Sequence, residues 1–165
     1  MPLIDALLPE FDHEMSTTRK VLERVPEEKF DWKPHPKSFS LGQLATHVST
    51  IPMWGEMTIT RSEIDVATGQ APDMPKSRAE VLERFDTHAA ATRAALAGAT
   101  DALMMSPWSL KRGTETIFTQ PKAAIWRGFV MSHLIHHRAQ LAVYLRLLDV
   151  PVPSMYGPSA DEAVF

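Results

Sequence analysis

The residues best suited to chemistry in this chain are histidines, and two of them stand one helical turn apart. Residues 129–148 contain no Gly or Pro and place apolar residues at helical spacing, which predicts a long helix. On it His133 and His137 lie about 40° apart, with Cβ atoms about 5–6 Å from each other. Both imidazoles can therefore reach one divalent ion through bonds of about 2.0–2.1 Å. We expect both to lie at the centre of the buried face.

A third histidine occupies a similar position on another predicted helix. Ser40 and Gln43 have the spacing of a capping box, and a helix from there to about Thr60 is expected to kink at Pro52. His47 lies at the centre of the apolar face of this helix. A buried imidazole needs a polar partner, so these three histidines are either hydrogen-bonded core residues or ligands of a shared metal.

Two further histidines lie near these faces. His136 falls at the edge of the face that carries His133, so it is a weaker candidate ligand and is expected to support the ligands from behind or to lie at the rim. His88 lies on the apolar face of a third predicted helix, where it is a neighbour of the metal or an ordinary core or interface histidine.

Other polar residues of the last helix have two possible roles. Gln140 and Tyr144 lie on the side of the histidines, where they bind a substrate or water, or satisfy each other in the core. Arg138 points away from the ion and is expected to form a salt bridge at the surface or a dimer interface. Trp54 and Trp126 are expected to wall the pocket.

Composition narrows the class of protein. The 165 residues fit a single domain spanning residues 1–165, and a 44% hydrophobic content is enough for a core. With 17 basic and 20 acidic residues and no basic patch, nucleic acid is not an expected partner. The absence of cysteine leaves only His, Asp and Glu as metal ligands. No signal peptide or membrane-length apolar run is seen, so a cytoplasmic location is expected.

The remaining pattern predicts an all-α fold. Amphipathic helices are expected at residues 3–25, 40–60, 77–96 and 121–148, with a short hairpin or extended excursion around 108–118. A capping box at Ser77 and Glu80 opens the third helix, and residues 69–75 form the loop before it. The Pro-rich tail at 150–159 is expected to lie back over the helices. Four long helices with one crossover connection form a four-helix bundle, whose core can hold a metal.

Several motifs resemble those of the DinB-like family of metal-dependent proteins, over nearly the whole chain. They are Asp31-Trp32-Lys33-Pro34, Leu44-Ala-Thr-His47, Trp54, His133-x-x-His136-His137-Arg138-x-Gln140, Tyr144-Leu-Arg146 and Val152-Pro-x-x-Tyr156-Gly-Pro-x-x-Asp161. The resemblance implies a four-helix bundle, usually dimeric, with a divalent ion on His47, His133 and His137. The family commonly has Gly where this chain has Ala139, a position off the metal face.

The family includes thiol-dependent transferases and a mycothiol-dependent maleylpyruvate isomerase. Three neutral imidazoles leave a fourth coordination position open, which is typical of a catalytic metal site. Together these features predict a metal-dependent transferase or isomerase that uses a low-molecular-weight thiol and a small-molecule substrate. Zinc and nickel are the metals that best suit imidazole ligands.

Two alternatives belong to other classes. In the first, the protein is a non-enzymatic helical dimer whose metal site is structural. Such a site needs a fourth protein ligand, and His88 or an acidic residue such as Asp161 would have to supply it. In the second, the chain binds no metal and acts through its dimer surface, a reading that the three histidines disfavour.

Overall fold

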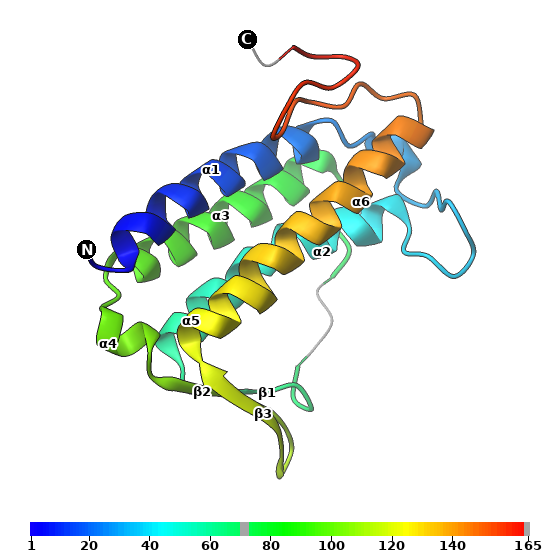
Figure 1. The fold of residues 1–165 in the computed structure, drawn as a ribbon. Coiled ribbons are helices and arrows are strands. Elements are labelled where there is room, and N and C mark those ends of the chain that lie inside the picture. The colour runs from blue at the N-terminus through cyan, green and yellow to red at the C-terminus, as the bar shows by residue number, and fades with distance from the viewer. Residues whose placement is uncertain (70–72, 164–165) are drawn as a thin grey trace.

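A computed structural model describes residues 1–69 and 73–163 and shows an all-α four-helix bundle (Figure 1). The predicted helices are present as α1 (Ile4–Glu23), α2 (Leu41–Thr60), α3 (Arg78–Ala97) and a final helix made of three segments. Those segments are α5 (Lys122–Ile125), the π-helical η2 (Trp126–Ser132) and α6 (His133–Leu147). No helix in the described part of the chain is both long and apolar enough to cross a membrane.

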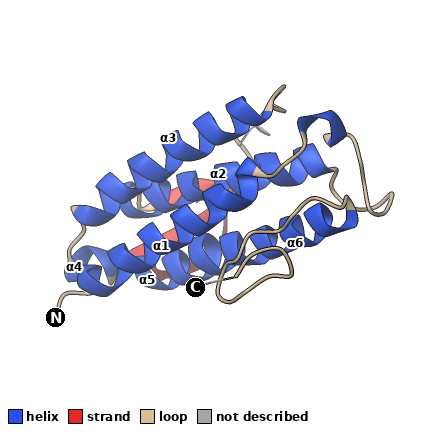
Figure 2. Ribbon diagram, turned by 90° about the horizontal axis from the view of Figure 1, so that it is seen from above, coloured by secondary structure: helices blue, strands red, loops and turns tan. Residues whose placement is uncertain are grey.

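The order of the helices around the bundle explains the crossover. Helix α1 packs against α3 and α6, and α2 packs against the same two helices, so α1 and α2 lie on opposite corners. Helices α2 and α3 run in the same direction, opposite to α1 and α6 (Figures 1 and 2). The chain must therefore return along the length of the bundle between α2 and α3, and this return is the predicted crossover connection.

Short elements close the ends of the bundle. They are η1 (Glu27–Lys29), β1 (Glu63–Asp65), α4 (Asp101–Met104), β2 (Pro107–Arg112) and β3 (Glu115–Pro121). Strands β2 and β3 form the predicted antiparallel hairpin, turning at Gly113 with φ of 60°. Strand β1, which the sequence pattern did not predict, pairs in parallel with β2. The sheet buries Trp108 and Leu110 against Ile125 and Trp54, which anchors it to α2 and α5.

The predicted helix caps are largely confirmed. The Ser40 side chain accepts a hydrogen bond from the Gln43 N–H, and the Gln43 side chain accepts one from the Ser40 N–H. At α3 the Ser77 hydroxyl accepts from the Glu80 N–H, but the Glu80 carboxylate accepts from the N–H of Lys76, so that capping box is only half formed.

The predicted loop at 69–75 includes residues 70–72, which lie outside the described residues.

Helix α2 stays helical through Pro52, one turn after His47. The Thr92 hydroxyl of α3 donates to the Pro52 carbonyl and accepts from the Glu56 N–H at 3.2 Å. In a regular α-helix that N–H and that carbonyl would bond each other directly, so the hydroxyl is inserted into the helical hydrogen-bond pattern. Gly55 permits this approach, because a Cβ there would lie 2.6 Å from the Thr92 methyl group. The contact fixes α2 against α3.

A buried lysine fixes the end of α2 against α5. Lys122 is 3% exposed, and its ammonium group donates to the carbonyls of Thr58, Ile59 and Arg61 at the end of α2. These carbonyls lack partners within their own helix, so a cation there completes the cap. Burial lowers the pKa of the Lys122 amine. With this end held, the final helix runs antiparallel to α2 with His133 opposite His47.

Arg138 differs from its expected position at a surface or dimer interface. It is 1% exposed and forms a salt bridge with Glu14 of α1, with 2.7 Å between nitrogen and oxygen. It also donates to the Thr18 hydroxyl and to the phenol oxygen of Tyr156. The expectation failed because the helical wheel located Arg138 relative to the histidines but could not show that α1 places a carboxylate on that side. Tyr156 belongs to the tail, which lies back over α1 as predicted.

Candidate metal centre

The three predicted histidines meet at the seam between α2 and α6. His47 comes from α2, and His133 and His137 come from successive turns of α6. One ring nitrogen from each lies within 4.8 Å of the others, and the Nε2 atoms of His47 and His133 are 3.1 Å apart. Two nitrogens bound to one tetrahedral ion at about 2.0–2.1 Å stand roughly 3.3 Å apart. The residues therefore fit a shared divalent ion.

The histidines are half-buried rather than at the centre of the buried face, which corrects the sequence-based expectation. The centre of that face is instead formed by Val130, Leu134, Arg138, Leu141 and Leu145. Two causes account for the difference. Helix α6 packs against both α1 and α2, so its buried arc is centred between them, while His133 and His137 both lie beside His47 of α2. In addition, η2 is π-helical and has wider turns than an α-helix, which rotates residues 126–132 relative to the histidines.

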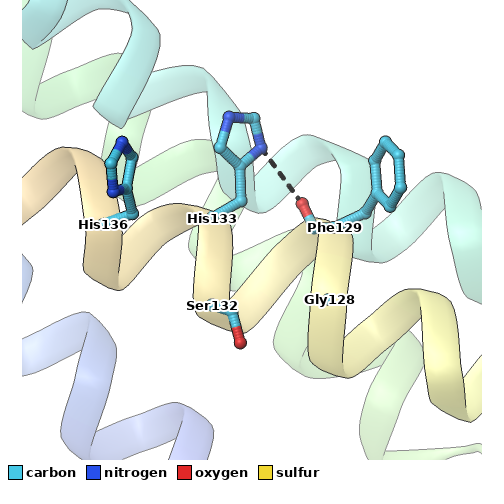
Figure 3. Close-up of a pocket in the computed structure, with 5 residues that line it drawn as sticks. All are labelled: Gly128, Phe129, Ser132, His133 and His136. Carbon is cyan, nitrogen blue, oxygen red and sulfur yellow. Dashed lines mark hydrogen bonds between the residues drawn. The ribbon is translucent and has the colours of Figure 1, made fainter.

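Hydrogen bonds orient two of the imidazoles. The Nδ1 atom of His133 lies 3.3 Å from the carbonyl oxygen of Phe129 (Figure 3), and Nδ1 of His137 lies 2.7 Å from Oε1 of Gln140. Both partners only accept hydrogen bonds through oxygen, so each Nδ1 carries the proton. The lone pair is then on Nε2, the atom of His133 that faces His47. This is the arrangement by which partners of a metal-bound histidine set its tautomer and orientation.

The predicted alternatives for Gln140 and Tyr144 can now be compared with their contacts. Gln140 accepts from His137, whereas the Tyr144 hydroxyl donates to the carbonyl oxygen of Phe39 at 3.2 Å. They do not satisfy each other. Both line one cavity beside the histidines, so their proposed contact with a substrate stays a prediction.

The remaining predicted site residues lie at the rim or elsewhere. His136 is exposed and its ring centroid lies 4.8 Å from that of His137, as expected for a rim residue. His88 lines a separate cavity with Glu80, Glu83, Arg84 and Thr87, so it is not a neighbour of the histidine cluster. Trp54 packs on the sheet and Trp126 lies in the core, and neither lines the two cavities beside the cluster, contrary to the expectation.

Those two cavities flank the histidines along α6. One, of about 410 Å³, is lined by Gly128, Phe129, Ser132, His133 and His136 (Figure 3). The other, of about 240 Å³, is lined by Lys37, Ser38, Phe39, Leu44, His137, Gln140 and Tyr144. The first adjoins His133 and the second adjoins His137, so a molecule in either cavity lies beside a candidate ligand. The sequence did not reveal Lys37 or Ser38, because their approach to α6 depends on the path of the connection before α2.

The environment keeps the imidazoles neutral. Burial lowers the pKa of His47 from 6.5 to about 4, and repulsion from His137 and His133 adds to the effect. Burial is also the main cause of the lowered pKa values of His133 and His137. Neutral imidazole is the form that binds a metal, so the cluster is ready for an ion near neutral pH without losing protons.

This lowered pKa predicts that the metal-free protein loses stability as the pH falls from 6.5 toward 4. In that window His47 is protonated in the unfolded chain but stays neutral in the folded chain. The unfolded state therefore binds more protons, and acidification stabilises it relative to the folded state. Guanidinium unfolding of the metal-free wild type and His47→Gln at about pH 7 and about pH 5 measures the effect. Between these two pH values the free energy of unfolding should fall more for the wild type than for the variant. Equal falls would contradict the lowered pKa of His47.

Gln140 is expected to affect metal affinity without touching the ion. Gln140→Leu removes the acceptor for His137, and loss of such a partner typically weakens metal binding by about 10–100-fold. Competition with a chromogenic zinc chelator gives the affinity. Gln140→Glu keeps an acceptor and should bind zinc at least as tightly as the wild type, whereas Gln120→Leu on the exposed face of β3 should change nothing. Equal affinities for both Gln140 variants would contradict this role.

Comparison with known proteins agrees with this fold. The model of the DinB superfamily matches residues 10–141. The chain is 24% identical over 159 residues to the uncharacterized protein YrdA of Bacillus subtilis, covering 96% of this chain and 91% of that protein. DinB-like proteins from Bacillus subtilis and Bacillus cereus have similar structures, each with a TM-score of 0.71, at 18% and 19% identity. These matches cover 91% and 94% of this chain, and 96% and 98% of the two solved chains. With most of its length matched by the family model, the chain belongs to the DinB superfamily.

Proposed function

We propose that the chain is a metal-dependent enzyme in which His47, His133 and His137 hold a divalent ion with an open coordination position. The observation that carries the proposal is the convergence of one nitrogen from each ring, with the opposite nitrogens of His133 and His137 held by protein acceptors. In the described residues this cluster contains no acidic residue that would close the site. An open position beside three protein ligands is typical of catalytic zinc.

The reaction class follows from what binds beside the ion. A bound divalent ion lowers the pKa of a coordinated thiol or water and so supplies a nucleophile near neutral pH. The chain contributes orientation through Phe129 and Gln140 and offers a cavity on each side of the histidines. Two cavities suit a reaction between two small molecules. The proposed activity is transfer or isomerisation with a low-molecular-weight thiol, and zinc or nickel is the proposed metal.

A structural metal site is the second candidate, and the positions of its fourth ligands disfavour it. His88 lies in a different cavity on α3. The Asp161 carboxylate pairs with Arg146 and accepts from the Val152 N–H, which holds the tail rather than the cluster. Neither residue joins the three histidines.

The enzyme proposal is tested by single-turnover reactions of zinc- and nickel-loaded protein. A panel of small thiols is incubated with alkyl halides and epoxides, and loss of free thiol is followed against the uncatalysed rate. We expect acceleration by the loaded wild type and none by His137→Ala. Background rates across the panel, with metal bound stoichiometrically, would reject the transfer activity and favour the structural site.

Three further properties remain part of this proposal. They are a single domain over residues 1–165, a cytoplasmic location and a homodimeric state without nucleic-acid partners. Light scattering coupled to size exclusion measures the oligomeric state directly, and a monomer at micromolar concentration would reject the dimer.

A further inference from the structure

We propose that the smaller cavity beside His137 binds a carboxylate group of the molecule that reaches the metal. This inference rests on the proposed function and names the chemistry of one substrate. The cavity lies between the chain segment that leads into α2 and the second half of α6. It is the cavity of about 240 Å³ that adjoins His137.

The charge of the cavity is the first observation. Among the described residues, Lys37 is the only charged residue that lines it, and none of the described Asp and Glu residues does. Lys37 also forms no salt bridge with any described residue. The whole chain has a net charge of −3, whereas the charged residue that lines this cavity, the exposed Lys37, is basic, so the cavity differs in sign from the protein. An anion is the ligand that such a cavity attracts.

The direction of the hydrogen bonds is the second observation, and it follows from metal binding. His137 can bind an ion through Nε2 only if its proton is on Nδ1, and that proton is donated to Oε1 of Gln140 at 2.7 Å. The amide oxygen of Gln140 is thereby used, and its NH₂ group is left as the donor. Gln140 is exposed and lines the cavity, so this donor is available to a ligand. A carboxylate accepts from both an ammonium and an amide N–H.

The sizes of the two cavities indicate which reactant each one binds. About 240 Å³ is below the range of roughly 300–1,000 Å³ for a drug-sized molecule, so the smaller cavity suits a short acidic fragment. The larger cavity, which Phe129 lines, takes the second and less polar reactant. The thiol that approaches His137 is therefore the one that carries the carboxylate.

The test compares acidic and neutral thiols of equal length on the zinc-loaded full chain. Calorimetry gives dissociation constants for 3-mercaptopropionate against 3-mercapto-1-propanol, and for 6-mercaptohexanoate against 6-mercapto-1-hexanol. We expect at least one acid to bind about five-fold more tightly than its alcohol, the upper range for a solvent-accessible ion pair. Lys37→Met should reduce that ratio to about one. Lys33→Met, at an exposed lysine of the same connection that does not line the cavity, should leave it unchanged.

Zinc content is measured before and after each titration, so the metal site and the carboxylate site are assessed separately. Equal dissociation constants for acid and alcohol in zinc-loaded wild type would overturn the carboxylate site and leave the proposed function intact. A preference that survives Lys37→Met would overturn it as well. A wild-type chain that takes up neither zinc nor nickel would reject both proposals.

Discussion

His137→Ala is expected to reduce metal content from about one divalent ion per chain to none, as measured by elemental mass spectrometry on protein purified without an affinity tag. The substitution removes one of the three proposed ligands, and the two remaining imidazoles, on different helices, should hold an ion weakly. His137 is half-buried at the seam, so its loss leaves the core formed by Leu134, Leu141 and Leu145 intact. The far-ultraviolet circular dichroism spectrum should therefore keep its helical form.

The chain offers a matched control for this experiment in His136. It neighbours His137 in sequence and has the same chemistry, but it is exposed and lies outside the cluster. His136→Ala should retain the ion. Metal bound by His137→Ala, or lost from His136→Ala, would contradict the assignment of the ligands. A wild type that remains metal-free after reconstitution with zinc and nickel would reject the metal centre altogether.

Arg138→Met is expected to lower the free energy of unfolding by about 3–5 kcal/mol, because it leaves the Glu14 carboxylate buried without its partner. The two side chains are 1% and 6% exposed, and their closest charged atoms are 2.7 Å apart. Arg138 also donates to the Glu14 carbonyl and the Thr18 hydroxyl, so the substitution removes several hydrogen bonds between α1 and α6. Guanidinium unfolding of the metal-free protein measures the change and excludes a contribution from the ion.

Two further variants separate the buried charge from a simple loss of contacts. Removing both charges in Glu14→Leu with Arg138→Met should recover part of the stability, because no unpaired ion is then left in the core. Arg93→Met breaks the exposed pair between Arg93 and Asp12 of the same bundle and should cost less than about 1 kcal/mol. A cost for Arg138→Met no larger than that for Arg93→Met would show that the buried pair has no special role.

Local sequence determined the helices, their main caps and the identity of the clustered histidines. The spacing of His133 and His137 is a property of any α-helix, and the Ser40 cap depends only on residues within one turn. Local sequence could not predict the contact between Pro52 and Thr92. The sequence indicates that Pro52 disturbs α2, but it cannot show that a hydroxyl from α3 enters the helix next to it.

Tertiary structure decided which surfaces those helices present. The burial of Arg138, the half-exposure of the histidines and the pairing of β1 all depend on neighbours distant in sequence. The same is true of Lys37, which reaches the site only because the connection before α2 passes alongside α6. Periodicity assigns each residue an angle on its own helix, whereas burial and charge depend on what lies opposite. The sequence therefore identified the three histidines, and only the packed bundle showed that they share one site with a cavity on either side.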